Sequence, residues 1–227
     1  MYEERFSRTA GATLWTRTAD GTPQRVLPDG CTDLIVIGGE LVVAGPDTRA
    51  HLATGLPGTR YLGLRFPPGR GPALLGVPAD ELRDRRVPLG ALWSGREARV
   101  LAEQVVEADD PAEVLARIAA DRQRTSPPPD PLVTALVPAL RAGEPVAAVA
   151  AAAGLGERQL RRRCLTAFGY GPKTLARVLR MNRALRLARD GVPYATVAAA
   201  TGYADQAHLA REVKALAGVP LSELPVR

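Results

Sequence analysis

Arginine is concentrated in one short stretch of the chain, ERQLRRRCL at residues 157–165. Leu160 and Cys164 are four residues apart, so on a helix they share one inward face with Ala167 and Phe168. The side chains left on the outward face are those of Arg158, Gln159, Arg161, Arg162 and, at its margin, Arg163. A guanidinium group can hold a phosphate, or the O6 and N7 edge of a guanine, with two hydrogen bonds. The stretch therefore predicts a surface that binds a polyanion; the alternative is a helix face that only maintains solubility.

The pattern around these arginines occurs twice in the chain. The first copy spans residues 146–169 and the second spans residues 194–218. Each copy reads as a small apolar helix, a turn at Gly154 or Gly202, and a second helix with polar faces. Two helices joined by a short glycine turn form a helix-turn-helix, whose second helix enters the major groove of DNA.

One long helix is predicted between the two copies, over residues 172–190, because Pro172 suits a first turn and Gly191 suits a C-terminal end. Its length would be roughly 28 Å, which can hold two recognition helices about one DNA turn, or roughly 34 Å, apart. Every third residue is an arginine: Arg177, Arg180, Arg183, Arg186 and Arg189. We expect this row to be a solvated face rather than a flank that contacts phosphate.

These pieces resemble the AraC/XylS family of bacterial transcription regulators. The matching stretches are AAAAGLGERQLRRRCLTAFGYGPKTLARVLRMNRALRLARDG and AAATGYADQAHLAREVKALAGVPLSEL. In the second copy, the family's usual G-F-S-D-Q-S-H-F-x-R reads GYADQAHLAR at residues 202–211. Cys164 and Val213 stand where the family usually has a core Phe, so the recognition helices are expected to be less tightly anchored.

The resemblance also implies which side chains face DNA. Alignment with the family implies that six side chains face the DNA groove: Arg158, Arg161, Arg162, Gln206, Ala207 and Arg211. Arginine suits guanine, Gln206 suits adenine, and Ala207 can meet a thymine methyl group, so a G-rich half-site is expected. His208 is expected to pack or to contact phosphate. The implied partners are duplex DNA, a small-molecule effector, RNA polymerase and a second copy of the chain.

The N-terminal half is β-prone. Residues 33–37 and 41–44 are apolar runs separated by Gly38-Gly39, a dipeptide typical of tight hairpins, and residues 61–66 form a third run. These runs predict a small antiparallel sheet or barrel. With the helices predicted elsewhere, the fold class is α+β, in which the C-terminal domain is all-α and joins its two helix-turn-helix units through the long helix.

The pattern becomes helical from Pro72 onward. Two short helices are expected on either side of Pro78, an amphipathic helix from Leu89 to Val105, and another helix opened by Asp110 and Pro111. The last two helices could form a dimer surface, but we expect them to belong to the core.

The boundary between domains is predicted at TSPPPDP, residues 125–131, because consecutive prolines favour a stiff extended linker. This divides the chain into an N-terminal domain, residues 1–124, and a C-terminal domain, residues 132–227. Residues 141–227 hold 14 Lys and Arg against 6 Asp and Glu, whereas the rest holds 16 against 18. The C-terminal domain alone is therefore expected to bind a polyanion.

The N-terminal domain carries a resemblance of its own. PDGCTDLIV, GLRFPPGRGPALLGVPADEL and VPLGALW are similar to an uncharacterised domain found in one branch of AraC-type regulators. In the wider family the N-terminal domain senses a small effector or mediates dimerisation, and we expect one of these roles here.

An enzymatic N-terminal domain is the alternative. Cys31 and His51 could form a nucleophilic pair, but such a pair needs a third orienting group, so a structural cysteine is favoured. Asp29, Cys31 and Asp33 lack the neighbours that a zinc site requires. We therefore expect no catalysis, metal or cofactor, although a cupin-like or Cys-dependent enzyme domain tethered to a DNA-binding module stays open.

Cellular location is inferred from the cysteines and from the apolar runs. Only two cysteines are present, one in each half, which favours a reduced, cytoplasmic protein. No apolar run reaches the length of a membrane span, and the N-terminus lacks the features of a signal peptide, so no membrane association is expected.

Overall fold

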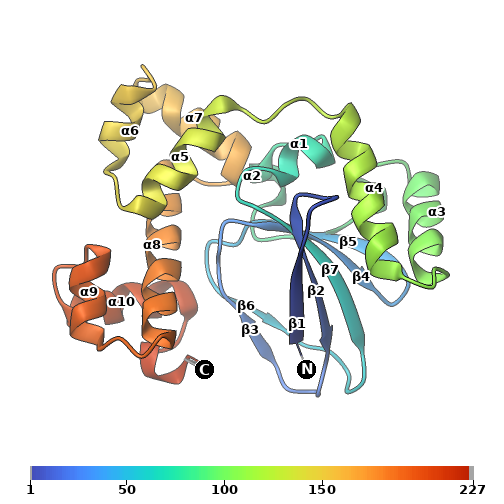
Figure 1. The fold of residues 1–227 in the computed structure, drawn as a ribbon, viewed down its shortest axis with the longest axis horizontal. Coiled ribbons are helices and arrows are strands. Elements are labelled where there is room, and N and C mark those ends of the chain that lie inside the picture. The colour runs from blue at the N-terminus through green and yellow to red at the C-terminus, as the bar shows by residue number, and fades with distance from the viewer. Residues whose placement is uncertain (1, 225–227) are drawn as a thin grey trace.

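The computed structural model, which describes residues 2–224, has a six-stranded antiparallel sheet in its N-terminal half. The strands are ordered β1-β2-β7-β4-β5-β8, while β3 pairs with β6 in a separate two-stranded sheet. Figure 1 shows the small sheet on the side of the molecule that faces the C-terminal helices. The strands are β1 (Tyr2–Ser7), β2 (Ala12–Thr18), β3 (Gln24–Val26), β4 (Thr32–Ile37), β5 (Glu40–Ala44), β6 (His51–Ala53), β7 (Arg60–Phe66) and β8 (Arg86–Pro88).

The other elements are helices, and together with the sheet they confirm the predicted α+β class. Those of the N-terminal half are α1 (Gly71–Leu75), α2 (Ala79–Leu82), the 3₁₀ turn η1 (Leu89–Ala91), α3 (Gly95–Val106) and α4 (Pro111–Thr125). Those of the C-terminal half are α5 (Pro131–Ala142), α6 (Val146–Ala152), α7 (Glu157–Phe168), α8 (Pro172–Arg189), α9 (Tyr194–Thr201), α10 (Gln206–Ala217) and η2 (Leu221–Glu223). None of the described helices combines the length and apolar character that crossing a membrane requires.

The hairpin between β4 and β5 forms where the sequence predicts it. Gly38 and Gly39 have φ angles of 57° and 86°, a left-handed conformation that glycine adopts without steric cost. Ile37 pairs with Glu40, so the turn contains only these two glycines. The register that follows places Leu34 opposite Val43.

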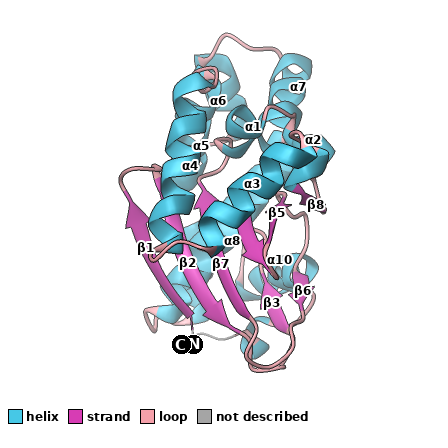
Figure 2. Ribbon diagram, turned by 90° about the vertical axis from the view of Figure 1, so that its right-hand side faces the viewer, coloured by secondary structure: helices cyan, strands magenta, loops and turns pink. Residues whose placement is uncertain are grey.

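Alternation along the strands gives the large sheet one apolar and one polar face. Leu14, Leu34 and Leu64 lie next to one another in the register of β2, β4 and β7, and all three are buried with Phe66. Helices α1, α3 and α4 pack against this face, and Figure 2 shows α3 and α4 lying across the strands. The two long helices are thus core elements, as expected.

The helix predicted to begin at Leu89 begins later, at Gly95. Leu89 to Ala91 form a 3₁₀ turn, and the Ser94 hydroxyl then caps α3 by accepting a hydrogen bond of 3.0 Å from the Glu97 amide. The apolar spacing runs through both segments, so spacing alone did not show the break. Helix α4 starts as predicted, with Asp110 as its cap and Pro111 in its first turn.

The C-terminal half has two apolar cores rather than one. Helices α5, α6 and α7 pack around Leu175 and Leu179 of α8, whereas α9, α10 and η2 pack around Met181 and Leu185 of the same helix. Cys164 and Val213, at the positions where a Phe was expected, are completely buried in the first and second core respectively. Figure 1 shows the two units at the two ends of α8.

The sheet generates a stability prediction at Gly63 of β7. Gly63 lies opposite Trp15, and an added Cβ would overlap the indole ring, so Gly63→Ala should lower the free energy of unfolding by about 1–3 kcal/mol through overpacking. Chemical denaturation followed by tryptophan fluorescence measures the change. Gly95→Ala is the matched control, because its Cβ would meet nothing within 4 Å in the first turn of α3, and no loss is expected. Equal stabilities of the two variants would contradict this account of the sheet.

Candidate nucleic-acid interface

Helix α7 presents the arginine cluster to solvent. Leu160, Cys164 and Phe168 are buried, each with an exposed fraction of 1% or less. The predicted contact residues of this helix are all exposed: Arg158, Gln159, Arg161 and Arg162. Gln159 also accepts a hydrogen bond of 3.3 Å from the Gly156 amide and so satisfies the backbone donor of the N-cap residue. The exposed face therefore includes the N-terminal turn of α7, the part of a recognition helix that reads bases.

Arg163 does not join that surface. Its guanidinium binds the Asp130 carboxylate at the start of α5, with Nε 2.9 Å from Oδ2. The hydrogen bond from Arg163 lowers the pKa of Asp130, so the pair stays charged. Arg163 thus connects α7 to α5. Its side chain lies at the margin of the outward face because it binds Asp130.

Helix α10 has the equivalent arrangement in the second unit. Leu209, Val213 and Leu216 are buried, while Gln206, Ala207 and Arg211 are exposed. The Asp205 carboxylate caps the helix by accepting a hydrogen bond of 2.6 Å from the His208 amide. The His208 ring packs edge-on against Tyr203, with 5.3 Å between centroids, which agrees with the packing role expected for it.

The arginine row of α8 is not a continuous solvated face. Arg177 Nε donates to Glu212 of α10 at 2.8 Å, and Arg180 lies 3.6 Å from the same carboxylate. The Arg180 guanidinium also stacks over the Tyr203 ring, 4.3 Å from its centroid. The expected solvated face is therefore wrong for these two residues. Their acidic partner, Glu212, lies on α10, and the spacing of arginines along α8 gives no information about residues on another helix. Arg183 is half-buried, and Arg186 and Arg189 are exposed.

A pocket of about 630 Å³ lies between the polar face of the large sheet, the small sheet and α8. Its wall includes Trp15, Ile35 and Arg65 from the large sheet and Asn182, Leu185 and Arg189 from α8. Leu224 from the end of the described chain also contributes. Side chains of both halves of the protein therefore share one cavity, a location that ligand sites favour.

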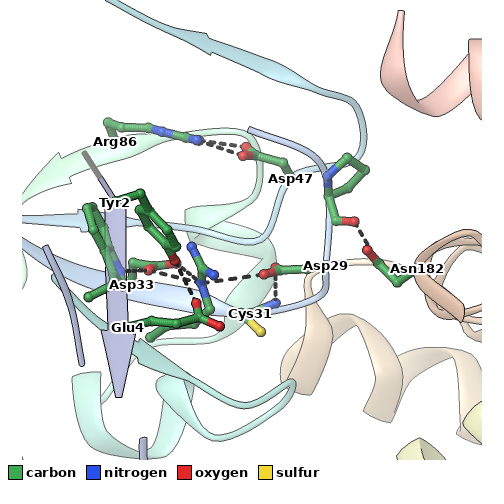
Figure 3. A network of polar contacts seen from close by, with 11 residues as sticks. Tyr2, Glu4, Asp29, Cys31, Asp33, Asp47, Arg86 and Asn182 are labelled. Carbon is green, nitrogen blue, oxygen red and sulfur yellow. Dashed lines mark hydrogen bonds and ion pairs between the residues drawn. The ribbon is translucent and has the colours of Figure 1, made fainter. Parts of the chain in front are cut away.

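A network of charged and polar groups forms one wall of the pocket (Figure 3). Trp15 Nε1 donates to Asp33 at 2.6 Å, and Arg65 Nε lies 3.2 Å from Asp33 and 3.5 Å from Asp29. Burial raises the pKa of Asp33. Nearby, Arg86 holds Asp47 through two hydrogen bonds of 2.6 Å. These carboxylates are thus each matched by an arginine within the N-terminal half.

The N-terminal and C-terminal halves of the protein also contact each other next to this pocket wall. In Figure 3 the Asn182 amide reaches from α8 to the Pro28 carbonyl, 2.9 Å away. Tyr170, which follows α7, is buried against the turn at Gly30. A side chain at Gly30 would approach the Tyr170 hydroxyl to 3.3 Å, and its φ of 83° also favours glycine.

Cys31 and His51 both line the pocket. Burial raises the pKa of the Cys31 thiol well above its usual value, and the carboxylates of Asp29 and Asp33 raise it further. A thiol kept protonated in this way is a poor nucleophile, because the thiolate is the reactive form. Within residues 2–224 no group of three or more His, Cys, Asp and Glu side chains is arranged to hold a metal ion.

Sequence reasoning missed the pocket and the partners of the α8 arginines. The pocket draws on residues from strands, loops and one helix that are distant in the chain, so no local spacing signals it. One signal did exist for the ion pair on α10: the offset of 49 residues that relates Leu160 to Leu209 also relates Arg163 to Glu212. Because this position is an arginine in one copy and a glutamate in the other, the residues that it binds are expected to carry opposite charges in the two units.

Two family models match the chain. Residues 149–225 match a family described as "Helix-turn-helix domain", and residues 12–88 match one described as "Domain of unknown function (DUF6597)". No curated protein matches the sequence.

Several solved structures of ToxT from Vibrio cholerae align with more than nine tenths of this chain. One in a P21 crystal form is 10% identical and aligns over 98% of this chain and 97% of ToxT, with a TM-score of 0.50. Another, bound to (E)-4-(8-methylnaphthalen-1-yl)but-3-enoic acid, is 9% identical over 98% and 97% of the two chains, with a TM-score of 0.49. By these matches, the chain carries a DUF6597 domain at residues 12–88 and a helix-turn-helix domain at residues 149–225.

Proposed function

We propose that this DNA-binding regulator recognises specific sequences through two exposed helix faces and responds to a small effector held between its halves. The observation that carries the proposal is that two recognition helices, α7 and α10, pack against the same helix, α8. Each exposes polar side chains on the side opposite its buried core: Arg158, Gln159, Arg161 and Arg162 on α7, and Gln206, Ala207 and Arg211 on α10. Each of the seven is proposed to contact DNA, with the arginines suited to guanine.

The ends of the N-terminal core and of the first C-terminal core support the proposed domain division. The N-terminal core includes α4, which ends at Thr125, and the first C-terminal core begins on α5, which starts at Pro131. We therefore propose that residues 125–131 are the linker, that residues 132–227 bind DNA, and that residues 1–124 carry the sensor.

The charges of the pocket favour an anionic effector. Arg17, Arg25 and Arg189 line it, and within residues 2–224 no carboxylate lies within ion-pair distance of these three. Leu185 and Leu224 add apolar surface beside them. A molecule with a carboxylate or phosphate at one end and an apolar body at the other would match both features.

Exposed side chains on α3, and the role of a DNA-binding regulator, support two further proposed partners. Val100 and Val106 of α3 are exposed apolar side chains, 40% and 53% accessible, which supports contact with a second copy of the chain. A regulator of this type acts at promoters, so RNA polymerase is a proposed partner and the cytoplasm the proposed location. The protonated Cys31 thiol supports a non-catalytic role for the N-terminal domain.

The first prediction concerns Arg162, which lies two residues beyond buried Leu160. Arg162→Ala should cost about 1–3 kcal/mol on the preferred DNA sequence and relax preference at one base pair, because a two-pronged guanine contact is lost. Arg186→Ala, on the exposed side of α8, should instead weaken binding to all DNA sequences alike if Arg186 contacts a phosphate, and the salt dependence of binding should then fall by about one unit. If Arg186 makes no contact with DNA, its replacement should not change the affinity.

Fluorescence anisotropy on selected and scrambled duplexes at several salt concentrations separates the two effects. If Arg162→Ala weakened both duplexes equally, or neither, α7 would not read bases through this residue.

The second prediction concerns the proposed division of labour. A fragment of residues 126–227 contains both C-terminal cores and should retain salt-sensitive DNA binding, whereas residues 1–125 should show none. Gel mobility shifts at two salt concentrations, on fragments whose folding is checked by circular dichroism, provide the measurement. Equal binding by the N-terminal fragment would overturn the assignment of DNA binding to the C-terminal domain.

The third prediction concerns the charge of the effector. Indole-3-acetate, indole-3-acetamide and tryptamine share one ring system but are anionic, neutral and cationic, and calorimetry should rank their affinities for the protein in that order. Arg189→Gln should weaken binding of the anion by about tenfold, or about 1.4 kcal/mol. Arg141→Gln, at an exposed position of α5 outside the pocket, is the control. Tighter binding of tryptamine than of the acetate would contradict an anion site.

A further inference from the structure

Among the described residues of the C-terminal domain, up to Leu224, helix α8 is the element that both helix-turn-helix units pack around. The first unit is built on Leu175 and Leu179 of α8, and the second on Met181 and Leu185, in separate apolar clusters. Long helices curve gently, so α8, with 18 residues, holds each unit on its own segment but does not by itself fix the angle between α7 and α10.

The N-terminal domain provides a second support, at equivalent points of the two units. Arg83 Nη1 donates to the Gly169 carbonyl at the C-terminal end of α7, at 3.0 Å. Arg25 Nη1 donates to the Ala217 carbonyl at the C-terminal end of α10, at 2.8 Å. Both helices end in a left-handed glycine, Gly169 and Gly218, which are the same position of the repeat. A cation at a helix C-terminus is favoured, because the last carbonyls carry partial negative charge.

Close packing accompanies both hydrogen bonds. A Cβ at Gly169 would lie 2.9 Å from Pro46 and 3.0 Å from the Ala79 carbonyl, and one at Gly218 would lie 3.2 Å from Arg25. Next to the second contact, the Ala50 amide donates to the Leu216 carbonyl at 2.7 Å. The N-terminal domain therefore touches both recognition helices directly, at the ends opposite to those that read bases.

We propose that Arg25 and Arg83 are positioning residues that hold the two recognition helices at one separation, and so fix the spacing between the two half-sites that the protein accepts. This rests on the proposed function, because it presumes that both units bind one DNA molecule. The two contacts leave the N-terminal turns of α7 and α10 exposed, so they set geometry without covering the DNA surface. One added base pair rotates a half-site by about one tenth of a turn, which a held pair of helices cannot follow.

The test compares spacing preference in the full-length protein. DNA selected with the wild type supplies the two half-sites, and duplexes with one base pair added or removed between them are then titrated. For the wild type we expect each shift to weaken binding by about tenfold, the scale of one mismatched base pair. For the Arg25→Ala, Arg83→Ala double variant we expect the loss to fall to about threefold or less, while affinity for the best spacing stays within about threefold.

Two controls isolate the positioning role. Arg85→Ala removes a neighbouring exposed arginine whose side chain bonds within its own domain, to the Glu81 carbonyl, and should keep the wild-type preference. Arg83→Lys combined with Arg25→Ala retains a cation at the end of α7 and should restore part of the preference that the double variant loses.

The outcomes are distinct. A flattened spacing preference with retained affinity for the best duplex supports the proposal. An unchanged preference, or an equal loss of affinity at every spacing, overturns it while leaving sequence-specific DNA binding in place. Failure of the wild type to select any sequence refutes the proposed function, and this inference with it.

Discussion

The architecture depends on one helix that serves two cores. Helix α8 contributes Leu175 and Leu179 to one unit and Met181 and Leu185 to the other, so neither unit can bury its apolar face without it. Since Met181 and Leu175 are fully buried, α8 cannot slide or rotate past one unit without exposing the other. The same helix also forms part of the pocket through Asn182 and Arg189, so the pocket lies against the element that joins the two helix-turn-helix units.

The two units use the same architecture with opposite charges. Arg163 on α7 pairs with Asp130 at the start of α5, and Glu212, at the equivalent position of α10, pairs with Arg177 and Arg180 of α8. In each case the recognition helix is bound to the helix that precedes its unit, α5 or α8. Partly exposed ion pairs contribute little stability, so their value here lies in orientation. A two-pronged guanidinium contact restricts how each recognition helix can turn about its own axis.

Sequence predicted most of what depends on neighbours in the chain. The repeat, the buried faces of α7 and α10, the two-glycine hairpin and the Asp110 cap all follow from local spacing, and the structure agrees with each. What could not be predicted depends on packing between distant segments. Arg180 stacks on Tyr203 and binds Glu212, and Arg25 meets a carbonyl 192 residues away, because the fold brings them together. Spacing along one helix cannot supply such partners.

Arg25 belongs both to the pocket wall and to the contact with α10, and this shared residue connects the two proposed roles of the N-terminal domain. An anion close to Arg25 competes with the Ala217 carbonyl for the same guanidinium, and a carboxylate or phosphate is the stronger acceptor. Arg83, at α7, is outside the pocket and is not subject to that competition. Occupation of the pocket would thus act on one of the two supports and leave the other in place. The contacts of Asn182 with Pro28 and of Arg83 with Gly169 do not involve Arg25, so they are independent of that competition.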